Sequence, residues 1–290
     1  MQVQVHECRS SCAPLGAEQT RGDDERMRRI AILGLLAAAG SGGVVHGARF
    51  AARSYLFPAS QIPAAQAPDG FERHTLAARD GVTVHALGLQ ATLGARTIVH
   101  FHNNRETVAS GAEVARALHA RGFGVLLVEY RGYGASRGSA PSEEGLYLDA
   151  ECALDMLAGR GVGPEDIVLW GTSLGTGVAA EMARRGRGAR LVLVTPYTSI
   201  PGLVTDVVPV LPARLLVRDH FDTLAKSGDI RIPTLVIHGD ADEIVPFWMG
   251  ERVAHAIRGA RLLRIAGAHH GDLFVREGDQ LLAEIAALSS

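Results

Sequence analysis

The chain has 290 residues, of which 47% are hydrophobic and 21% are charged, so it is long and apolar enough to bury a large core. This composition excludes a wholly disordered polymer. The 29 basic and 31 acidic side chains leave a net charge of −2, without the positive excess that drives binding to phosphate backbones, and we expect no nucleic-acid partner. Three cysteines are too few for a disulfide framework.

Residues 1–69 differ in composition from the rest of the chain. Residues 1–29 are polar and show no periodicity, which predicts a disordered tail. Residues 30–48 contain no side chain that is charged at neutral pH, and as a helix they would reach about 28 Å, close to the thickness of a bilayer core. We therefore expect residues 30–48 to be an N-terminal membrane anchor or signal segment. The proline-containing residues 49–69 are predicted to be a linker.

Residues 30–48 have more than one interpretation. Arg28 and Arg29 followed by a short apolar run fit a cleaved secretory signal, especially if translation begins at Met27 rather than Met1. The many glycines lower both hydrophobicity and helix propensity, which would also suit an ordinary cytosolic helix. We expect a protein that is membrane-associated through this segment or exported, and a cytoplasmic location is the less favoured interpretation.

Residues 70–290 alternate short apolar runs with amphipathic stretches, as expected for an α/β domain. The predicted strands are 71–77, 82–89, 96–101, 124–129, 166–170, 190–194, 234–238 and 261–265. The predicted helices are 108–121, 142–159, 174–185, 247–257 and 279–288. This alternation predicts a mostly parallel central sheet of about eight strands with helices on both faces, its first two strands forming an antiparallel hairpin. Ligands bind such sheets at the carboxyl ends of the strands.

A Gly-x-Ser-x-Gly pattern occurs twice, around Ser136 and around Ser173. A nucleophile elbow needs a strand that runs straight into a sharp turn and then a helix, because this geometry exposes the serine oxygen above the sheet. Ser173 has that context, between the apolar run 167–170 and a predicted helix. Ser136 lies several residues beyond its strand, and Pro141 follows before a helix can begin. We predict Ser173 as the nucleophile and interpret Ser136 as an ordered loop residue.

A serine nucleophile needs a histidine base held by a carboxylate, and the chain offers both downstream. Asp240, Asp242 and Glu243 follow the predicted strand 234–238, and two histidines follow the predicted strand 261–265. The order serine, acid, histidine is the one found in α/β hydrolases. Spacing alone leaves open which acid and which histidine act, and Asp240 could instead hydrogen-bond the backbone of its own turn.

Acyl transfer also needs N–H donors for the oxyanion. The backbone N–H of Leu174, directly after the nucleophile, is the first expected donor. The second is expected from the loop His102-Asn103-Asn104 after the strand 96–101, and we assign it to the backbone N–H of Asn104. The same loop could be an Asx turn that opens the helix near Glu106, and the two interpretations are compatible.

These motifs identify a family. The sequence resembles the α/β-hydrolase-fold serine hydrolases, and among them the membrane-anchored α/β-hydrolase-domain proteins and their bacterial relatives, from about Val82 to the C-terminus. The resemblance is carried by residues 130–138, 141–147, 171–175, 237–242 and 267–272. It implies an α/β-hydrolase fold with Ser173 as nucleophile, Asp242 as acid and His270 as base, and no metal or organic cofactor. The usual His-Gly-Asn of the family appears here as His102-Asn103-Asn104, which weakens the assignment to Asn104.

The predicted function is that of a serine hydrolase that cleaves a carboxylic ester or thioester of a small-molecule or lipid acyl substrate through an acyl-enzyme. Residues 197–221 are rich in valine, leucine and proline and form a small lid-like insertion, which favours an apolar acyl group, although the same residues would suit a core. A serine peptidase or amidase of the same fold, and a non-catalytic binding protein with that fold, are the alternatives.

Overall fold

The computed structural model describes residues 42–59, 62, 67–210 and 212–289. The predicted tail 1–29 and most of the uncharged segment 30–48 lie outside these residues. The described part of that segment belongs to helix α2 (Gly42–Leu56), which continues past residue 48 into the range predicted as a linker. No helix in the described ranges is both long and apolar enough to cross a bilayer. The predicted hydrolase domain falls in one compact unit, Ala52–Ser290.

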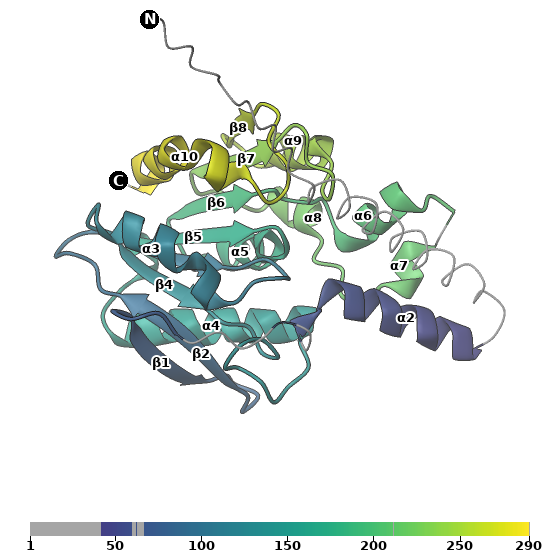
Figure 1. Cartoon of the computed structure of the whole chain (residues 1–290), viewed down its shortest axis with the longest axis horizontal. Helices are drawn as coiled ribbons and strands as arrows, with labels where there is room; N and C mark the ends of the chain where they lie inside the picture. Colours follow the sequence, from purple (N-terminus) through teal and green to yellow (C-terminus); the bar gives the residue numbers. More distant parts are fainter. Residues whose placement is uncertain (1–41, 60–61, 63–66, 211, 290) are drawn as a thin grey trace, which may run out of the picture. The chain divides into compact units, whose positions relative to one another are not determined.

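A single eight-stranded sheet forms the centre of this unit, in the order β1-β2-β4-β3-β5-β6-β7-β8 (Figure 1). The strands are β1 (Glu72–Ala77), β2 (Thr83–Leu89), β3 (Thr97–Phe101), β4 (Gly124–Val128), β5 (Ile167–Thr172), β6 (Arg190–Val194), β7 (Thr234–Gly239) and β8 (Arg261–Ile265). β1 and β2 form the predicted antiparallel hairpin, β2 also runs antiparallel to β4, and all later pairs are parallel. The predicted mostly parallel sheet is confirmed.

Helices cover both faces of the sheet, because alternate residues of each buried strand point to opposite sides. The main helices are α3 (Ala112–His119), α4 (Glu143–Gly159), α5 (Leu174–Arg184), α9 (Phe247–Ala256) and α10 (Leu273–Ser289). In β5, Ile167 and Leu169 pack in one core with α4, α5 and α9. Val168 and Trp170 pack in a second core with α3 and α10. The strand therefore has no solvent-facing side.

Helix α10 begins earlier than its periodicity indicated, at Leu273 rather than residue 279. Its backbone departs from helical angles at Glu277, so that a first turn precedes the kink and the longer helix follows it. Gly278 beside the kink lowers helix propensity, which hides this first turn in the sequence.

The chain between β6 and β7 includes the predicted insertion 197–221 and the residues that follow it up to β7. It contains three short helices that the sequence analysis did not assign. They are α6 (Ile200–Val207), α7 (Ala213–Leu216) and α8 (Thr223–Ser227). Two backbone hydrogen bonds close the insertion at its base, from the Ile200 N–H to the His220 carbonyl (2.8 Å) and from the Leu224 N–H to the Thr198 carbonyl (2.9 Å). The two ends of the insertion are therefore joined to each other at the carboxyl edge of the sheet.

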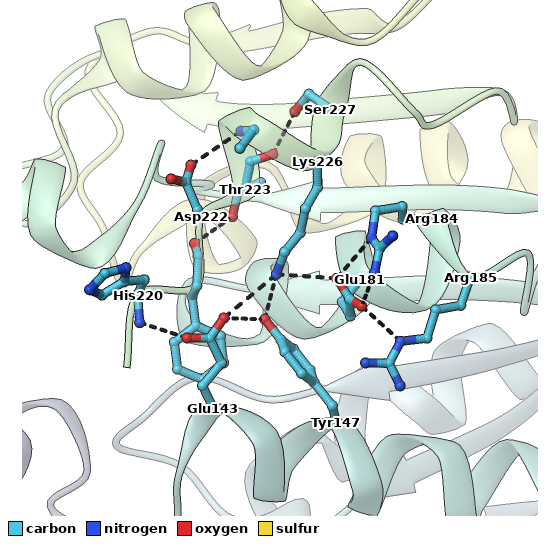
Figure 2. A network of polar contacts seen from close by, with 12 residues as sticks. Glu143, Tyr147, Glu181, Arg184, Arg185, His220, Asp222, Thr223, Lys226 and Ser227 are labelled. Atoms are coloured by element: carbon cyan, nitrogen blue, oxygen red, sulfur yellow. Dashed lines mark hydrogen bonds and ion pairs between the residues drawn. The ribbon is translucent and has the colours of Figure 1, made fainter. Parts of the chain in front are cut away.

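Charged side chains anchor this base to the helices beneath it (Figure 2). Glu143 at the start of α4 accepts a hydrogen bond from the His220 N–H at 2.6 Å. Lys226 in α8 contacts Glu143 at 3.7 Å and the buried Glu181 of α5 at 3.3 Å. Burial opposes the charge on Glu181, but Arg184, Arg185 and Lys226 outweigh it and lower the pKa of Glu181 to about 2. The ionised cluster ties α4, α5 and α8 together.

Backbone approaches backbone closely where the first turn of α5 meets the end of β3. A Cβ atom on Gly175, in the first turn of α5, would stand 2.0 Å from the carbonyl oxygen of Phe101, the last residue of β3. Backbone lies on both sides of this contact, so no flexible side chain can move to relieve it.

We therefore expect Gly175→Ala to lower the free energy of unfolding by about 3 kcal/mol, measured by urea denaturation. Gly159→Ala is the matched control, because Gly159 also lies in a helix and nothing would meet its Cβ within 4 Å. That control should leave stability unchanged or raise it by about 0.5–1 kcal/mol. Equal stabilities of the two variants would contradict the close approach.

Candidate active site

Ser173 occupies a strained turn between β5 and α5. Its backbone has φ 50° and ψ −114°, a region that non-glycine residues rarely adopt and that costs on the order of 1–3 kcal/mol. The Ser173 N–H donates to the Val194 carbonyl of the neighbouring strand at 2.9 Å, which helps to hold the turn. The strand, turn and helix expected around Ser173 are therefore present.

His270 lies within hydrogen-bond distance of both other predicted residues. Its Nε2 is 3.0 Å from the Ser173 Oγ, and its Nδ1 is 2.8 Å from the Asp242 Oδ2. Since Asp242 can only accept when ionised, the Nδ1 carries the proton and the Nε2 presents a lone pair to the serine. The structure thus brings Ser173, His270 and Asp242 together in the order that proton transfer requires.

Asp242 is a buried carboxylate with donors on both oxygens. Its Oδ1 accepts the N–H groups of Ile244 (2.9 Å) and Val245 (2.8 Å). Its Oδ2 lies 2.8 Å from His270 and 3.3 Å from the Nε2 of His238. Burial opposes the charge, but the hydrogen bonds from His238, His270 and the backbone outweigh it and hold the pKa of Asp242 well below its usual range.

The residues that spacing could not separate have different partners. Asp240 accepts from the Arg264 guanidinium and, at 2.6 Å, from the Gly267 N–H, so it holds two loops together. His269 pairs through its Nδ1 with Glu243 at 3.0 Å. Neither contact involves Ser173.

Ser136 is buried in its loop. Its Oγ accepts the His85 N–H at 2.9 Å and donates to the Glu129 carbonyl at 3.3 Å. These two bonds use the hydroxyl to fix the loop against β2 and β4, as the interpretation of an ordered loop residue requires.

The loop after β3 contains the predicted Asx turn, which is compatible with an oxyanion role for the same loop. The Asn103 side chain accepts the Arg105 N–H at 2.8 Å. Asn104 is held by its side chain, which donates to the Leu56 carbonyl at 3.0 Å, and by its carbonyl, which accepts from the Tyr133 hydroxyl at 3.1 Å. Leu174 is the first residue of α5, so its N–H has no acceptor within the helix. The donor roles of Leu174 and Asn104 stay predictions.

Sequence reasoning missed two groups beside the site. His238, in the predicted strand before the acid, contacts Asp242. Glu106, considered only as a helix start, is close enough to His270 to be influenced by its charge. Burial raises the pKa of Glu106, and hydrogen bonds from Asn103 oppose this shift. His238 lies inside the motif 237–242, but neither that motif nor any spacing predicts a role for His238 or Glu106.

A second buried pair lies behind the loop that follows β3. The Glu129 Oε1 accepts the Val108 N–H at 3.1 Å and stands 3.7 Å from the Nε2 of His102. Burial raises the pKa of Glu129 to about 7 and lowers the pKa of His102 to about 4. The two side chains therefore carry little charge together, unlike Asp242.

The raised pKa of Glu129 has a consequence for stability. Between about pH 4.5 and 7 the folded chain binds more protons at Glu129 than the unfolded chain, so this group's stabilising contribution falls as the pH rises. We expect Glu129→Gln to gain stability relative to the wild type between pH 4 and pH 8, by on the order of 1–3 kcal/mol, in urea denaturation at the two pH values. Glu251→Gln, at an exposed position, should show no such change. A pH-independent difference for Glu129→Gln would contradict the shift.

Comparisons with known proteins agree with this fold. The family model described as "Serine aminopeptidase, S33" matches residues 95–221. An uncharacterized protein of Mycobacterium tuberculosis is 40% identical over 176 residues, which is 60% of this chain and 62% of that protein. The protein bem46 of Schizosaccharomyces pombe is 32% identical over 61% of this chain and 62% of its own length. The chain thus spans less than two thirds of the length of these relatives.

Solved esterases share the architecture at lower sequence identity. An esterase of Pyrococcus furiosus has a TM-score of 0.64 with 16% identity, covering 78% of this chain and 95% of that one. An esterase of Exiguobacterium antarcticum has a TM-score of 0.59 with 17% identity, covering 73% and 97%. The sheet order and these structural neighbours show that the chain has the α/β-hydrolase fold, and the matching family model agrees with it.

Proposed function

We propose that the protein is a serine hydrolase that cleaves a carboxylic ester or thioester. The observation that carries this proposal is the continuous hydrogen-bonded series from the Ser173 Oγ through His270 to the ionised Asp242. The elbow adds the N-terminus of α5, whose dipole favours negative charge at the position of a developing oxyanion.

In the proposed reaction, the Nε2 of His270 takes the proton of the Ser173 hydroxyl as its oxygen attacks the carbonyl carbon. Asp242 stabilises the imidazolium that forms, and the Leu174 and Asn104 N–H groups hold the oxyanion. His270 then gives its proton to the leaving alcohol or thiol, which leaves an acyl group on Ser173. Water, activated by the same histidine, releases the acid and restores the serine. These residues need no cofactor for any step.

The insertion supports an apolar acyl group. A cavity of about 730 Å³ lies among α6, α7 and α9. Pro201, Leu215 and Trp248 give it an apolar part, while Asp206, Arg214, Asp222 and Arg252 also line it, and no residue of the triad does. The insertion starts directly beside the elbow, because the Tyr197 hydroxyl donates to the Leu174 carbonyl at 3.1 Å. We also propose that residues 30–48 associate the enzyme with a membrane, where acyl lipids are its substrates.

The matched family model favours one alternative, an aminopeptidase, by its description. Side-by-side turnover of acyl esters, acyl thioesters and aminoacyl amides by the same preparation separates the two reactions. Amide turnover above ester turnover would replace the proposal with peptidase activity.

A fluorophosphonate probe tests the nucleophile. We expect the wild type and Ser136→Ala to form a covalent adduct and Ser173→Ala to form none, with the adduct located by peptide mass spectrometry. An adduct on Ser136 would overturn the assignment of the nucleophile, and a folded wild type that stays unlabelled would favour a non-catalytic binding protein.

Trp248→Ala tests the acyl site. Removing this half-exposed ring should lower kcat/KM for a long-chain ester about tenfold, because apolar contact with the chain is lost, while acetyl ester turnover stays the same. Leu93→Ala, a fully exposed apolar residue that does not line the cavity, is the control. Equal losses on both esters would exclude the cavity as the acyl site.

A further inference from the structure

His238 is buried against the acid of the proposed triad. It lies next to the end of β7, its side chain is fully buried, and its Nε2 stands 3.3 Å from the Asp242 Oδ2 and 2.9 Å from the Val245 carbonyl. Both neighbours of this nitrogen are acceptors, so it carries the proton, which it donates to the Val245 carbonyl while the same N–H lies in close polar contact with the Asp242 Oδ2. The second nitrogen, Nδ1, is buried and has no hydrogen-bond partner.

The ring of His238 has no freedom to turn. A Cβ atom on Gly250 of α9 would stand 2.1 Å from the Nδ1, so the helix backbone closes this side of the ring. Phe247 meets the ring edge-on, with centroids 5.7 Å apart. Strand, helix and aromatic ring therefore fix the direction in which the Nε2–H points.

Asp242 needs such a fixed donor. Rotation of the carboxylate about the Cβ–Cγ bond is soft and moves both oxygens together. The two backbone N–H groups oppose this rotation at Oδ1, and a donor at Oδ2 opposes it from the other side. Oδ2 is the atom that orients His270. A second imidazole N–H on Oδ2 sets the plane of the carboxylate and with it the direction of the His270 Nε2 toward Ser173.

We propose that His238 is a positioning residue that holds the Asp242 carboxylate in the plane needed to orient His270. This inference rests on the proposed serine hydrolase function and assigns it a residue outside the triad. His238 acts through Asp242 and does not contact the reacting atoms.

Three substitutions in the full-length chain separate positioning from plain structural support. His238→Gln keeps an N–H at the same bonded distance from Cβ as the imidazole Nε2. His238→Asn matches it in polarity, but its amide ends at the depth of Nδ1 and cannot reach Asp242. His238→Leu fills the space without a donor.

The measurement is the rate of inactivation by a fluorophosphonate probe at several probe concentrations, with the melting temperature of each variant recorded beside it. The limiting rate of covalent attack should fall about 10- to 100-fold in the Asn and Leu variants, as for other residues that orient a reactive group indirectly. The probe concentration at half-maximal rate should not change. The Gln variant should retain a rate within about fivefold of the wild type, even where its melting temperature falls.

Limiting rates equal to the wild type in all three variants would overturn the inference, leaving His238 as support for the Val245 carbonyl alone. A Gln variant as slow as the Leu variant would overturn it too, since the donor would then not be the operative atom. An unlabelled wild type would overturn the proposed function and this inference with it. If the wild type is labelled and all three variants have its limiting rate, the proposed role of His238 is wrong and the proposed hydrolase function stands.

Discussion

The close approach of backbone between the first turn of α5 and the end of β3 is the constraint on which the rest of the site depends. Gly175 in α5 leaves room for the Phe101 carbonyl, so α5 can start directly above β3 and β5. These neighbouring strands send their connections in opposite directions, which opens the carboxyl edge between them. The strained φ of Ser173 persists because the buried strand and helix on either side leave the turn no other path.

Two buried carboxylates show how the fold decides charge. Asp242 has donors on both oxygens, and its pKa falls although burial opposes ionisation. Glu129 is as well buried and accepts from the Val108 N–H, but the donors around it do not offset desolvation, and its pKa rises to about 7. The number and charge of the donors, rather than the depth of burial, separates a fixed anion from a group that titrates near neutrality.

The insertion combines a fixed base with an apolar outer part. The base is held by backbone hydrogen bonds and by Lys226 between two carboxylates (Figure 2). Farther from this base, Val207, Val210 and Leu215 are exposed, at 53%, 80% and 72% of their surface. Exposed apolar side chains beside a cavity are costly in water, so they are expected where an apolar ligand is to be met. This arrangement suits a lid that stays attached while its outer part contacts the substrate.

Much of the fold follows from the sequence, because a strand that is buried on both faces must be apolar along its length and a covering helix must be apolar on one side. The eight strands therefore appear in the sequence nearly at their final bounds, and Ser173 is distinguished from Ser136 by the strand and helix around it. The short helices of the insertion do not appear, since four to eight residues with prolines carry too little periodicity. The early start of α10 is hidden by Gly278 for a related reason.

The amino-acid sequence is enough to predict the class of fold, the nucleophile elbow at Ser173 and the order of serine, acid and histidine. Spacing left the acid and the histidine open, and the family resemblance implied Asp242 and His270. The tertiary structure shows that Asp242 rather than Asp240 faces His270, and that His270 rather than His269 faces Ser173. Residues one or two apart in a loop have nearly the same spacing to every distant residue, so only the direction of each side chain separates them. The same holds for His238, which is one polar residue in an apolar strand until the acid loop folds back over it. The direction of a side chain is set by contacts between segments far apart in the chain, so local sequence patterns do not predict it.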